Sequence, residues 1–234
     1  MMSESAIIMA AGLGERMRPL TEHTPKPLIR VNGRPMIETV IDGLHLRGVE
    51  DILIVTGYLC EQFRTLTDKY PGVSIAENRE YRIKNNISSI YAARHFLGKS
   101  DVFICEADLY ISEPEIFRGE LISSCYFGRM TDGYSDDWVF DTDEDGYITR
   151  VGKGGKDCYN MVGISFFMKE DAAVLKKAIE EEYNKTGSDQ LFWDEVVDRN
   201  LDKLKLKVYP VDPGQLVELD TVEELENFEK GIRK

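Results

Sequence analysis

The first half of the chain alternates between short, continuous apolar runs and segments whose apolar residues recur at helical spacing. The apolar runs predict strands at residues 6–11, 52–56, 73–76 and 102–105. The helical spacing predicts a helix between Pro35 and Gly48 and further helices at residues 61–70 and 87–97. Strands that are apolar throughout and separated by helices indicate a mainly parallel sheet covered on both faces. Ligands bind at the carboxyl ends of such strands, so we expect the loop after the first strand and Asp108 to share one edge.

The second half of the chain has more strands and fewer helices. Strands are predicted at residues 124–130, 138–141, 147–151, 161–168 and 205–211, with a hairpin turn at residues 143–146. Helices are predicted at residues 170–183, 191–197 and 221–232, the last with a Thr221/Glu224 capping box. We expect a single α/β domain over residues 1–234, with a mixed, mostly parallel sheet sandwiched by helices and a small β-rich insertion.

Composition and charge exclude several classes of protein. The chain carries 29 Lys and Arg residues against 42 Asp and Glu, a net charge of −13, whereas binding to a nucleic-acid backbone needs a dense basic face. No segment approaches the roughly 18 apolar residues of a membrane helix, and no basic segment precedes the first apolar run. The four cysteines are widely spaced and predict reduced thiols (Cys60, Cys105, Cys125 and Cys158). We therefore expect a cytoplasmic protein without nucleic-acid or membrane partners.

The most informative segment is the glycine loop after the first strand, Ala10-Ala11-Gly12-Leu13-Gly14-Glu15-Arg16-Met17. Two glycines at a strand end let the backbone approach a phosphate closely and point N–H groups at it. Arg16 and, further on, Lys26 add the positive charge that a polyphosphate needs. A dinucleotide-binding fingerprint would have a third glycine where Met17 stands, and the Gly-Lys-Ser/Thr of a P-loop is absent.

The complete string, continued by Arg18-Pro19-Leu20-Thr21 and Pro25-Lys26-Pro27-Leu28, resembles the signature of nucleotidyltransferases. These enzymes join a nucleoside triphosphate to a phosphorylated small molecule and release pyrophosphate. Glu15 departs from the family pattern, where Ser or Thr is common. The resemblance implies a Rossmann-like fold and a nucleotide-binding half at residues 1–110, with the acceptor-binding half at residues 111–234. It also implies a set of nucleotide-binding residues: Ala10, Ala11, Gly12, Gly14, Arg16, Lys26, Asn86 and Ser88.

The same resemblance assigns roles in the reaction. Arg16 and Lys26 would act as the catalytic cations that neutralise the phosphates and the leaving group. Glu106-Ala107-Asp108 lies where the family carries a metal-binding aspartate, and Glu218-Leu219-Asp220 resembles its second carboxylate motif. This implies a Mg²⁺ ion held by Asp108, Asp220 and Glu218. Residues 160–164 resemble a later substrate-site segment of the family.

Three further strings, at residues 84–91, 136–139 and 189–194, resemble the small bacterial cytidylyltransferases, above all those specific for CTP and phosphocholine. The related 2-aminoethylphosphonate cytidylyltransferases have similar strings. The expected partners are therefore CTP and a small zwitterionic phospho- or phosphono-amine acceptor. The sequence carries no signal for an oligomeric state.

Recognition of the acceptor leaves two interpretations open. A quaternary ammonium needs aromatic faces with a carboxylate nearby, whereas a primary ammonium is satisfied by carboxylates alone. Both residue types occur in the acceptor-binding candidates, which are Asn85, Asp137, Trp138, Lys153, Phe192, Trp193 and Asp194. Alternatively, Phe192 and Trp193 are core residues of a helix and Trp138 packs on a sheet.

We thus expect a cytidylyltransferase that transfers CMP from CTP to phosphocholine, giving CDP-choline and pyrophosphate. The attacking oxygen is already anionic near neutral pH, so positioning and charge neutralisation suffice and no general base is needed. The first alternative is the same reaction on 2-aminoethylphosphonate. Two further alternatives are less favoured. A sugar-1-phosphate nucleotidyltransferase would be recognised by its preference among nucleoside triphosphates. A catalytically silent nucleotide-binding module would be excluded by detectable pyrophosphate release.

Overall fold

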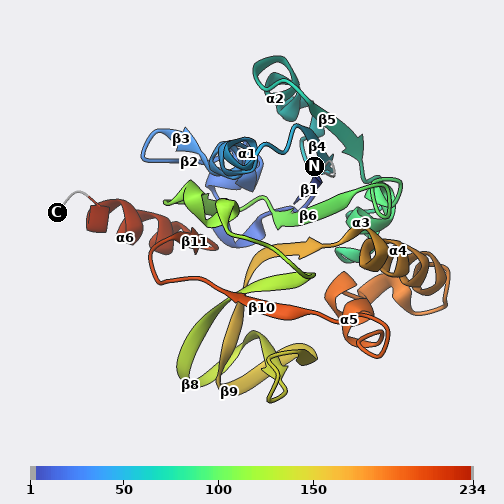
Figure 1. Ribbon diagram of the computed structural model, residues 1–234. Helices are drawn as coiled ribbons and strands as arrows, with labels where there is room; N and C mark the ends of the chain where they lie inside the picture. The colour runs from blue at the N-terminus through green and yellow to red at the C-terminus, as the bar shows by residue number, and fades with distance from the viewer. Residues whose placement is uncertain (1–3, 233–234) are drawn as a thin grey trace.

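A seven-stranded sheet forms the centre of the molecule in the computed structural model, which describes residues 4–232 (Figure 1). In spatial order its strands are β10 (Lys207–Pro210), β8 (Cys125–Thr142), β9 (Ile148–Phe167), β6 (Asp101–Glu106), β1 (Glu4–Ala10), β4 (Asp51–Thr56) and β5 (Val73–Glu77). β1 pairs in parallel with β4 and β6, β4 with β5, and β10 with β8, whereas β9 runs antiparallel to β6 and β8. The predicted mixed, mostly parallel sheet is confirmed.

Helices cover both faces of this sheet because the strands are apolar on both sides. Along β1, Ala6 and Ile8 face a core that includes residues of α1 (Met36–Arg47) and α2 (Arg64–Lys69). Ile7 faces the other core, built with α3, α4 and α5. These three helices span Ile87–Ala93, Lys169–Tyr183 and Trp193–Asp198. None of the helices in residues 4–232 is long and apolar enough to cross a lipid bilayer.

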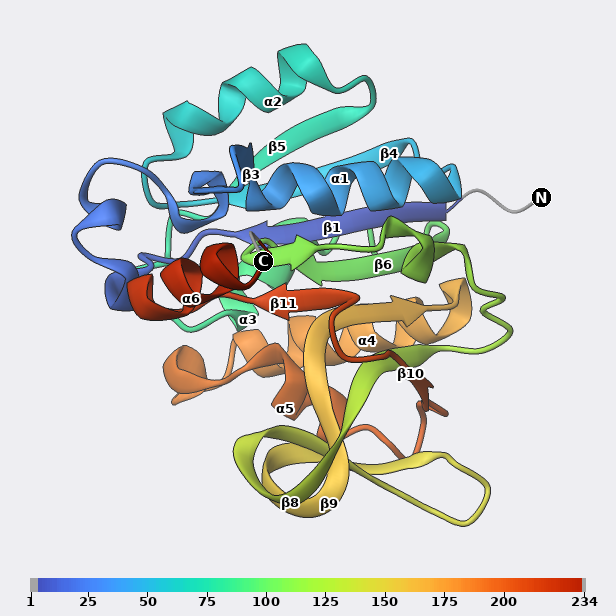
Figure 2. The same cartoon turned by 90° about the vertical axis from the view of Figure 1, so that its left-hand side faces the viewer.

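The β-rich insertion is a hairpin of two very long strands, β8 and β9, which projects from the body of the molecule (Figure 2). The sequence predicts four shorter strands here, because the polar and glycine-rich stretches at residues 131–137 and 152–157 are typical of loops. In the structure these stretches pair with each other through irregular, bulged register. Cross-strand pairing thus outweighs the weak local propensity.

Three predicted helices begin later or end earlier than expected. The segment at residues 61–70 begins as a 3-10 helix, Cys60–Phe63, before α2. α3 ends at Ala93, and the chain turns before Leu97 forms an isolated bridge to Ser100. The helix expected at residues 191–197 begins only at Trp193, after a 3-10 turn at Ser188–Gln190.

Two small antiparallel sheets were missed by the sequence pattern because their strands have only two or three residues. One joins β7 (Leu109–Ile111) to β11 (Leu216–Glu218), and the other joins β2 (Arg30–Val31) to β3 (Arg34–Pro35). Pairing of Glu218 with Leu109 brings Asp108, which precedes β7, beside Glu218 and Asp220 at one end of the β7–β11 pair, near the edge where β1 and β6 end. These minor strands therefore connect distant parts of the chain at the site.

A third apolar cluster lies beneath the same edge. It packs Met17 of the glycine loop against Leu219 and Leu225, together with residues near β2 and β3. Leu225 belongs to α6 (Val222–Ile232), which begins with the predicted capping box. Glu224 N–H donates to Thr221 Oγ1 at 3.2 Å, and Thr221 N–H donates to Glu224 Oε2 at 2.9 Å. The cluster fixes the segment that carries Asp220 against the glycine loop.

Truncating this cluster should destabilise the fold. Leu219 is 1% exposed, and we expect Leu219→Ala to lower the free energy of unfolding by roughly 2–5 kcal/mol through the cavity it leaves. The matched control is Leu46→Ala, since Leu46 is 42% exposed and should change stability by less than about 0.5 kcal/mol. Urea denaturation measures both. Equal, small losses in the two variants would show that the cluster is not a stabilising core.

Candidate active site

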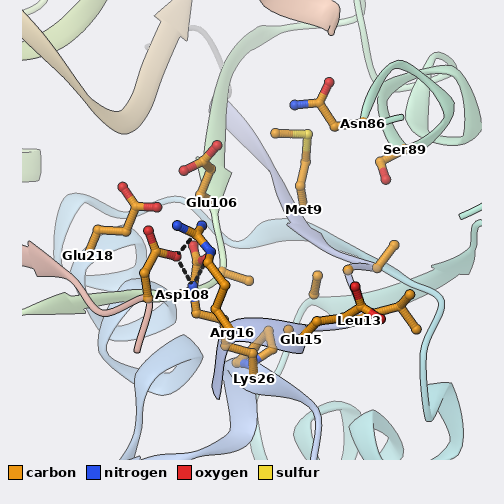
Figure 3. A pocket seen from close by; sticks show the side chains of 17 residues that line it. Met9, Leu13, Glu15, Arg16, Lys26, Asn86, Ser89, Glu106, Asp108 and Glu218 are labelled. Carbon is orange, nitrogen blue, oxygen red and sulfur yellow. Dashed lines mark hydrogen bonds and ion pairs between the residues drawn. The ribbon is translucent and has the colours of Figure 1, made fainter. Parts of the chain in front are cut away.

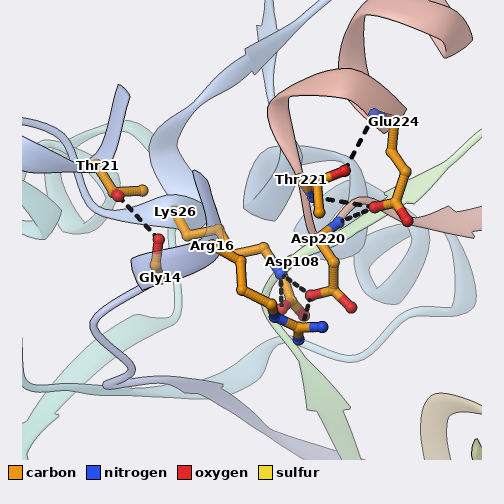
Figure 4. Close-up of polar contacts among 8 residues, drawn as sticks. All are labelled: Gly14, Arg16, Thr21, Lys26, Asp108, Asp220, Thr221 and Glu224. Atoms are coloured by element: carbon orange, nitrogen blue, oxygen red, sulfur yellow. Dashed lines mark hydrogen bonds and ion pairs between the residues drawn. The ribbon is translucent and has the colours of Figure 1, made fainter. Parts of the chain in front are cut away.

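The glycine loop leaves β1 at Ala10 and folds back on itself beside Lys26. Gly14 has φ +62°, and Thr21 Oγ1 donates to its carbonyl oxygen at 2.8 Å (Figure 4). A Cβ at Gly14 would lie 2.9 Å from Lys26 Cβ, so the loop needs glycine here for both backbone and space. A Cβ at Gly12 would meet no atom within 4 Å. Gly12 therefore borders open space, and Gly14 shapes the loop.

Lys26 joins the glycine loop to two distant carboxylates. Its Nζ donates to Asp108 Oδ2 at 2.6 Å and to Asp220 Oδ1 at 2.6 Å (Figure 4). Arg16 Nη2 lies 2.8 Å from the same oxygen of Asp220. Burial alone lowers the pKa of Lys26, but Asp108 and Asp220 outweigh it, and the net pKa is raised. Lys26 is therefore a buried, fully charged ammonium.

Next to Lys26 lies a cluster of acids in which Glu106, Asp108 and Glu218 each offer a carboxylate oxygen within 4.8 Å of the others. Burial and the charges of Asp108 and Glu218 hold the pKa of Glu106 well above its usual value. Glu218 retains contact with solvent, yet desolvation and repulsion from Asp108 and Asp220 raise its pKa to about 8. Four carboxyl groups, those of Glu106, Asp108, Glu218 and Asp220, thus stand beside the two cations Lys26 and Arg16. Such a set of oxygen ligands fits a hard divalent cation.

Glu106 is the member that the sequence analysis did not assign to the metal. Its position in the sequence could have indicated this role. Residues two apart at the end of a strand point in similar directions, and Asp108 was already predicted as a metal ligand. Asp220 lies outside the three-carboxylate cluster but is connected to it through Lys26.

These groups line a main pocket of about 520 Å³ at the carboxyl edge of β1 and β6 (Figure 3). Most predicted nucleotide-binding and metal-binding residues lie in it: Ala10, Ala11, Gly12, Gly14, Arg16, Lys26, Asn86, Asp108, Glu218 and Asp220. Asn86 and Ser89 stand across the pocket from the carboxylates (Figure 3). The predicted Ser88 is not among the residues lining the main pocket. Its neighbour Ser89 lies there instead.

Ser88 is used by the protein itself. It is 2% exposed, and its Oγ accepts from Asn78 Nδ2 at 2.8 Å and donates to the carbonyl oxygen of Asn85 at 2.7 Å. Together with the predicted acceptor residue Asn85 it borders a neighbouring cavity of about 150 Å³, which shares Ala11, Gly12, Asn86 and Ser89 with the main pocket. Its hydroxyl thus stabilises the first turn of α3.

The remaining acceptor candidates do not converge on one site. Asp137 borders a side cavity of about 230 Å³ together with Arg129, Asn160, Glu218 and Asp220. Glu218 and Asp220 also line the main pocket, so the side cavity adjoins the reaction site.

Trp138, the next residue along β8, points away from that cavity because successive side chains of a strand face opposite sides. It lines an aromatic cavity of about 540 Å³ with Lys153 and Phe192. The Trp138 and Phe192 rings meet edge to face at 5.3 Å, and Lys153 Nζ lies 5.5 Å from the Phe192 ring centre. The main pocket and the aromatic cavity share no lining residue.

Trp193 and Asp194 are buried at the start of α5, each 3% exposed, and neither lines the main pocket or the side cavity. Trp193 packs on Tyr126 at 5.9 Å, and Tyr126 OH donates to Asp194 Oδ1 at 3.0 Å. Burial raises the pKa of Asp194 to about 7 despite that hydrogen bond. Both residues thus lie in the core, as the alternative interpretation has it for Trp193, and their predicted contact with the acceptor stays a prediction. The helix α5 packs on the sheet and is strongly buried. The polar residues on either side of it in the sequence gave no sign of this burial.

The site combines a glycine loop at the end of a parallel strand, two cations and an acidic cluster. Enzymes that transfer nucleotidyl groups need these three features to bind and neutralise a triphosphate and its metal ion. The model of the MobA-like NTP transferase domain matches residues 6–124. A 2-aminoethylphosphonate cytidylyltransferase of Lancefieldella rimae is 55% identical over 227 residues, which cover 97% of this chain and 92% of that protein. A choline-phosphate cytidylyltransferase of Streptococcus pneumoniae is 34% identical over 97% of this chain and 98% of that protein.

The solved structure of the CTP:phosphocholine cytidylyltransferase from Streptococcus pneumoniae superposes with a TM-score of 0.91 at 33% identity, covering 98% of this chain and 99% of that one. The chain belongs to the MobA-like NTP transferase family and is a nucleotidyltransferase. The resemblance predicted from the glycine loop is confirmed.

The two loop glycines should respond differently to an added methyl group. We expect Gly14→Ala to cost about 1 kcal/mol or more of stability, because φ +62° strains alanine and the methyl group presses on Lys26. Gly12→Ala should fold with unchanged stability but bind nucleoside triphosphate more weakly, since its methyl group enters the pocket. Thermal denaturation and nucleotide titration separate the effects. Wild-type nucleotide affinity in Gly12→Ala would contradict close approach of the ligand.

Asp194 should make stability depend on pH. The folded state, with a pKa of about 7 for Asp194, keeps a proton that the unfolded state releases near pH 4. Wild-type stability should therefore fall between about pH 4 and 7, by up to about 1.4 kcal/mol per pH unit from this group. Asp194→Asn cannot titrate, so its stability relative to wild type should rise over this window and level off above it. A difference that is constant from pH 4 to 8 would contradict the raised pKa.

Proposed function

We propose that this enzyme transfers CMP from CTP to 2-aminoethylphosphonate and releases pyrophosphate. The choice of acceptor depends on the side cavity. This cavity is rich in carboxylates, and two of them, Glu218 and Asp220, also line the main pocket. The relative with 55% identity over almost the whole chain supports the same acceptor. The alternative acceptor of the sequence analysis is thus better supported than phosphocholine.

On the nucleotide side, the triphosphate lies along the backbone of Gly12 and Gly14, and Arg16 and Lys26 neutralise it. Lys26 already stands beside Asp108 and Asp220, so it is held rigidly in place for phosphate contact. Asp108, Asp220 and Glu218, with Glu106 added, would hold a Mg²⁺ ion. When bound, this ion supplies positive charge against the phosphate oxygens.

The reaction forms one bond and breaks one. A phosphonate oxygen of the acceptor attacks the α-phosphorus of CTP, and the bond from that phosphorus to the bridging oxygen of the β-phosphate breaks, so that pyrophosphate carries away the electron pair. The attacking oxygen is already ionised, so the protein needs no general base. The residues of the main pocket align the groups and offset the charge on the leaving pyrophosphate.

The acceptor's ammonium group decides the choice between the two amines. A primary ammonium has three N–H donors, and Asp137 and the amide oxygen of Asn160 are acceptors for them in the side cavity. In the described part of the chain that amide oxygen has no hydrogen-bond partner. A quaternary ammonium has no N–H to donate and gains most from aromatic faces, but Trp138 and Phe192 line a different cavity. We assign the nucleotide to residues 1–110 and the acceptor mainly to residues 111–234. Glu218 and Asp220, from the second half, also line the main pocket on the nucleotide side.

Phosphocholine is the second candidate. It is favoured by the fold and coverage shared with the choline-phosphate cytidylyltransferase of Streptococcus pneumoniae. A direct comparison of the two acceptors separates the candidates.

We expect pyrophosphate release with CTP and Mg²⁺ to be at least about tenfold faster, as kcat/KM, with 2-aminoethylphosphonate than with phosphocholine, which is about 1.4 kcal/mol of transition-state stabilisation. Asp137→Asn should lower kcat/KM for 2-aminoethylphosphonate about tenfold by weakening the ammonium contact. Trp138→Leu should stay within about threefold of wild type.

Two results would reverse this assignment. One is equal or faster turnover of phosphocholine, and the other is a greater loss in Trp138→Leu than in Asp137→Asn. If neither acceptor gives pyrophosphate, the sugar-1-phosphate nucleotidyltransferase and the silent binding module become the favoured alternatives. Assays with UTP or ATP and sugar phosphates then distinguish the two, because only the nucleotidyltransferase releases pyrophosphate.

A further inference from the structure

Behind the main pocket lies a small inner cavity of about 10 Å³, close to the space that one water molecule needs. It is bordered by residues of β1, β6, β8, β9 and α5. Met9 and Glu106 line both this cavity and the main pocket, where Figure 3 shows them. Glu106, one of the three clustered acids, therefore borders both the inner cavity and the main pocket.

Trp193 supplies an unsatisfied donor at this cavity. The residue is 3% exposed, and within residues 4–232 its indole Nε1–H has no hydrogen-bond partner. A buried donor without a partner costs about 1–3 kcal/mol, so native proteins satisfy such groups with protein atoms or buried water. Its neighbour Asp194 also lines the cavity and accepts from Tyr126 OH through Oδ1. A donor and an acceptor therefore border the same water-sized space.

Glu106 turns one oxygen toward this side. A Cβ at Gly163, which also lines the inner cavity, would lie 2.9 Å from Glu106 Oε2. Gly163 has φ +74° and thus leaves room for the carboxylate at a position that favours glycine. The same Glu106 carboxylate offers an oxygen to the cluster with Asp108 and Glu218. A hydrogen-bond partner in the inner cavity would therefore affect the orientation of the Glu106 carboxylate.

We propose that one water molecule occupies the inner cavity, accepts the indole N–H of Trp193 and donates to Asp194 and Glu106. Trp193 and Asp194 are then positioning residues that orient Glu106 toward the metal ion. Water has two donors and two acceptor sites, so this arrangement satisfies every group named. The inference rests on the proposed function only in taking Glu106 as a metal ligand. It gives Trp193 and Asp194 a role that does not involve the acceptor.

The consequence is a weaker metal site when the inner partners are removed. Partners behind a metal ligand commonly account for about 10–100-fold in metal affinity. Trp193→Phe keeps the ring in the core and deletes the N–H, and Asp194→Asn keeps the size and removes the charge. We expect Mn²⁺, used as a paramagnetic probe, to bind roughly tenfold more weakly to both variants. Trp138→Phe is the matched control, because it makes the same chemical change in the aromatic cavity, and its Mn²⁺ affinity should equal that of wild type.

Mn²⁺ binding is measured by electron paramagnetic resonance on the full chain with CTP and no acceptor, so no turnover occurs. CTP affinity without metal should not change in either variant. Wild-type Mn²⁺ affinity in Trp193→Phe and Asp194→Asn would overturn the proposal. Because no acceptor is present, this result does not depend on which amine the enzyme uses, and a preference for phosphocholine would leave the inference standing.

A second measurement requires no inner-cavity variant. The chain has two tryptophans, so ¹⁵N-tryptophan labelling gives two indole signals, which Trp138→Phe assigns. We expect the Trp193 indole proton to show a cross-relaxation signal to a long-lived water and slow exchange with solvent. A Trp193 signal without any contact to water would overturn the proposal even if Trp193→Phe failed to fold.

Discussion

The contact of Lys26 with Asp108 and Asp220 is the interaction on which the site depends. A buried ammonium is tolerated only when it is paired, and here two carboxylates pair with it at 2.6 Å each. The partners lie 82 and 194 residues away in the sequence. The small β7–β11 sheet and the apolar cluster around Met17 and Leu219 hold the three segments together. Charge pairing and local packing therefore fix the same geometry.

This geometry concentrates opposite charges in a small space. Lys26 and Arg16 stand on the glycine-loop side, and Glu106, Asp108 and Glu218 stand together on the other. Burial, and after it the neighbouring carboxylates, raises the pKa values of Glu106 and Glu218. An anionic triphosphate with a divalent cation supplies the complement to both sides. In a protein of net charge −13, local cations rather than the overall field must attract the nucleotide.

In the function we propose, specificity for the acceptor depends on the pleat of one strand. Asp137 and Trp138 are neighbours in β8, and the pleat sends one toward the metal-binding acids and the other into the aromatic cavity. The same adjacent residues could serve a primary or a quaternary ammonium, depending on which of them faces the reaction site. Behind the site, Trp193 and Asp194 bring polar groups into the core where only a water-sized space remains.

Local signals made much of this protein predictable. The glycine loop and Lys26 belong to one short motif, Asp108 was placed by the rule that parallel strands bind ligands at their carboxyl ends, and Asp220 was placed by the resemblance to the family's second carboxylate motif. Continuous apolar runs likewise predicted the central sheet, and the Thr221/Glu224 pattern predicted the start of α6. These features depend on residues close together in the sequence.

Other features were decided by the tertiary structure. The role of Glu106 depends on Glu218 pairing across β7 and β11, whose strands are too short to give a periodic signal. The long hairpin forms because polar stretches pair with each other, and this pairing decides that Asp137 and Trp138 face different cavities. Trp193 and Asp194 are buried because the short helix α5 packs on the sheet. Residue type and spacing determine local chemistry, but the direction in which a side chain points is set by contacts between segments that the sequence keeps far apart.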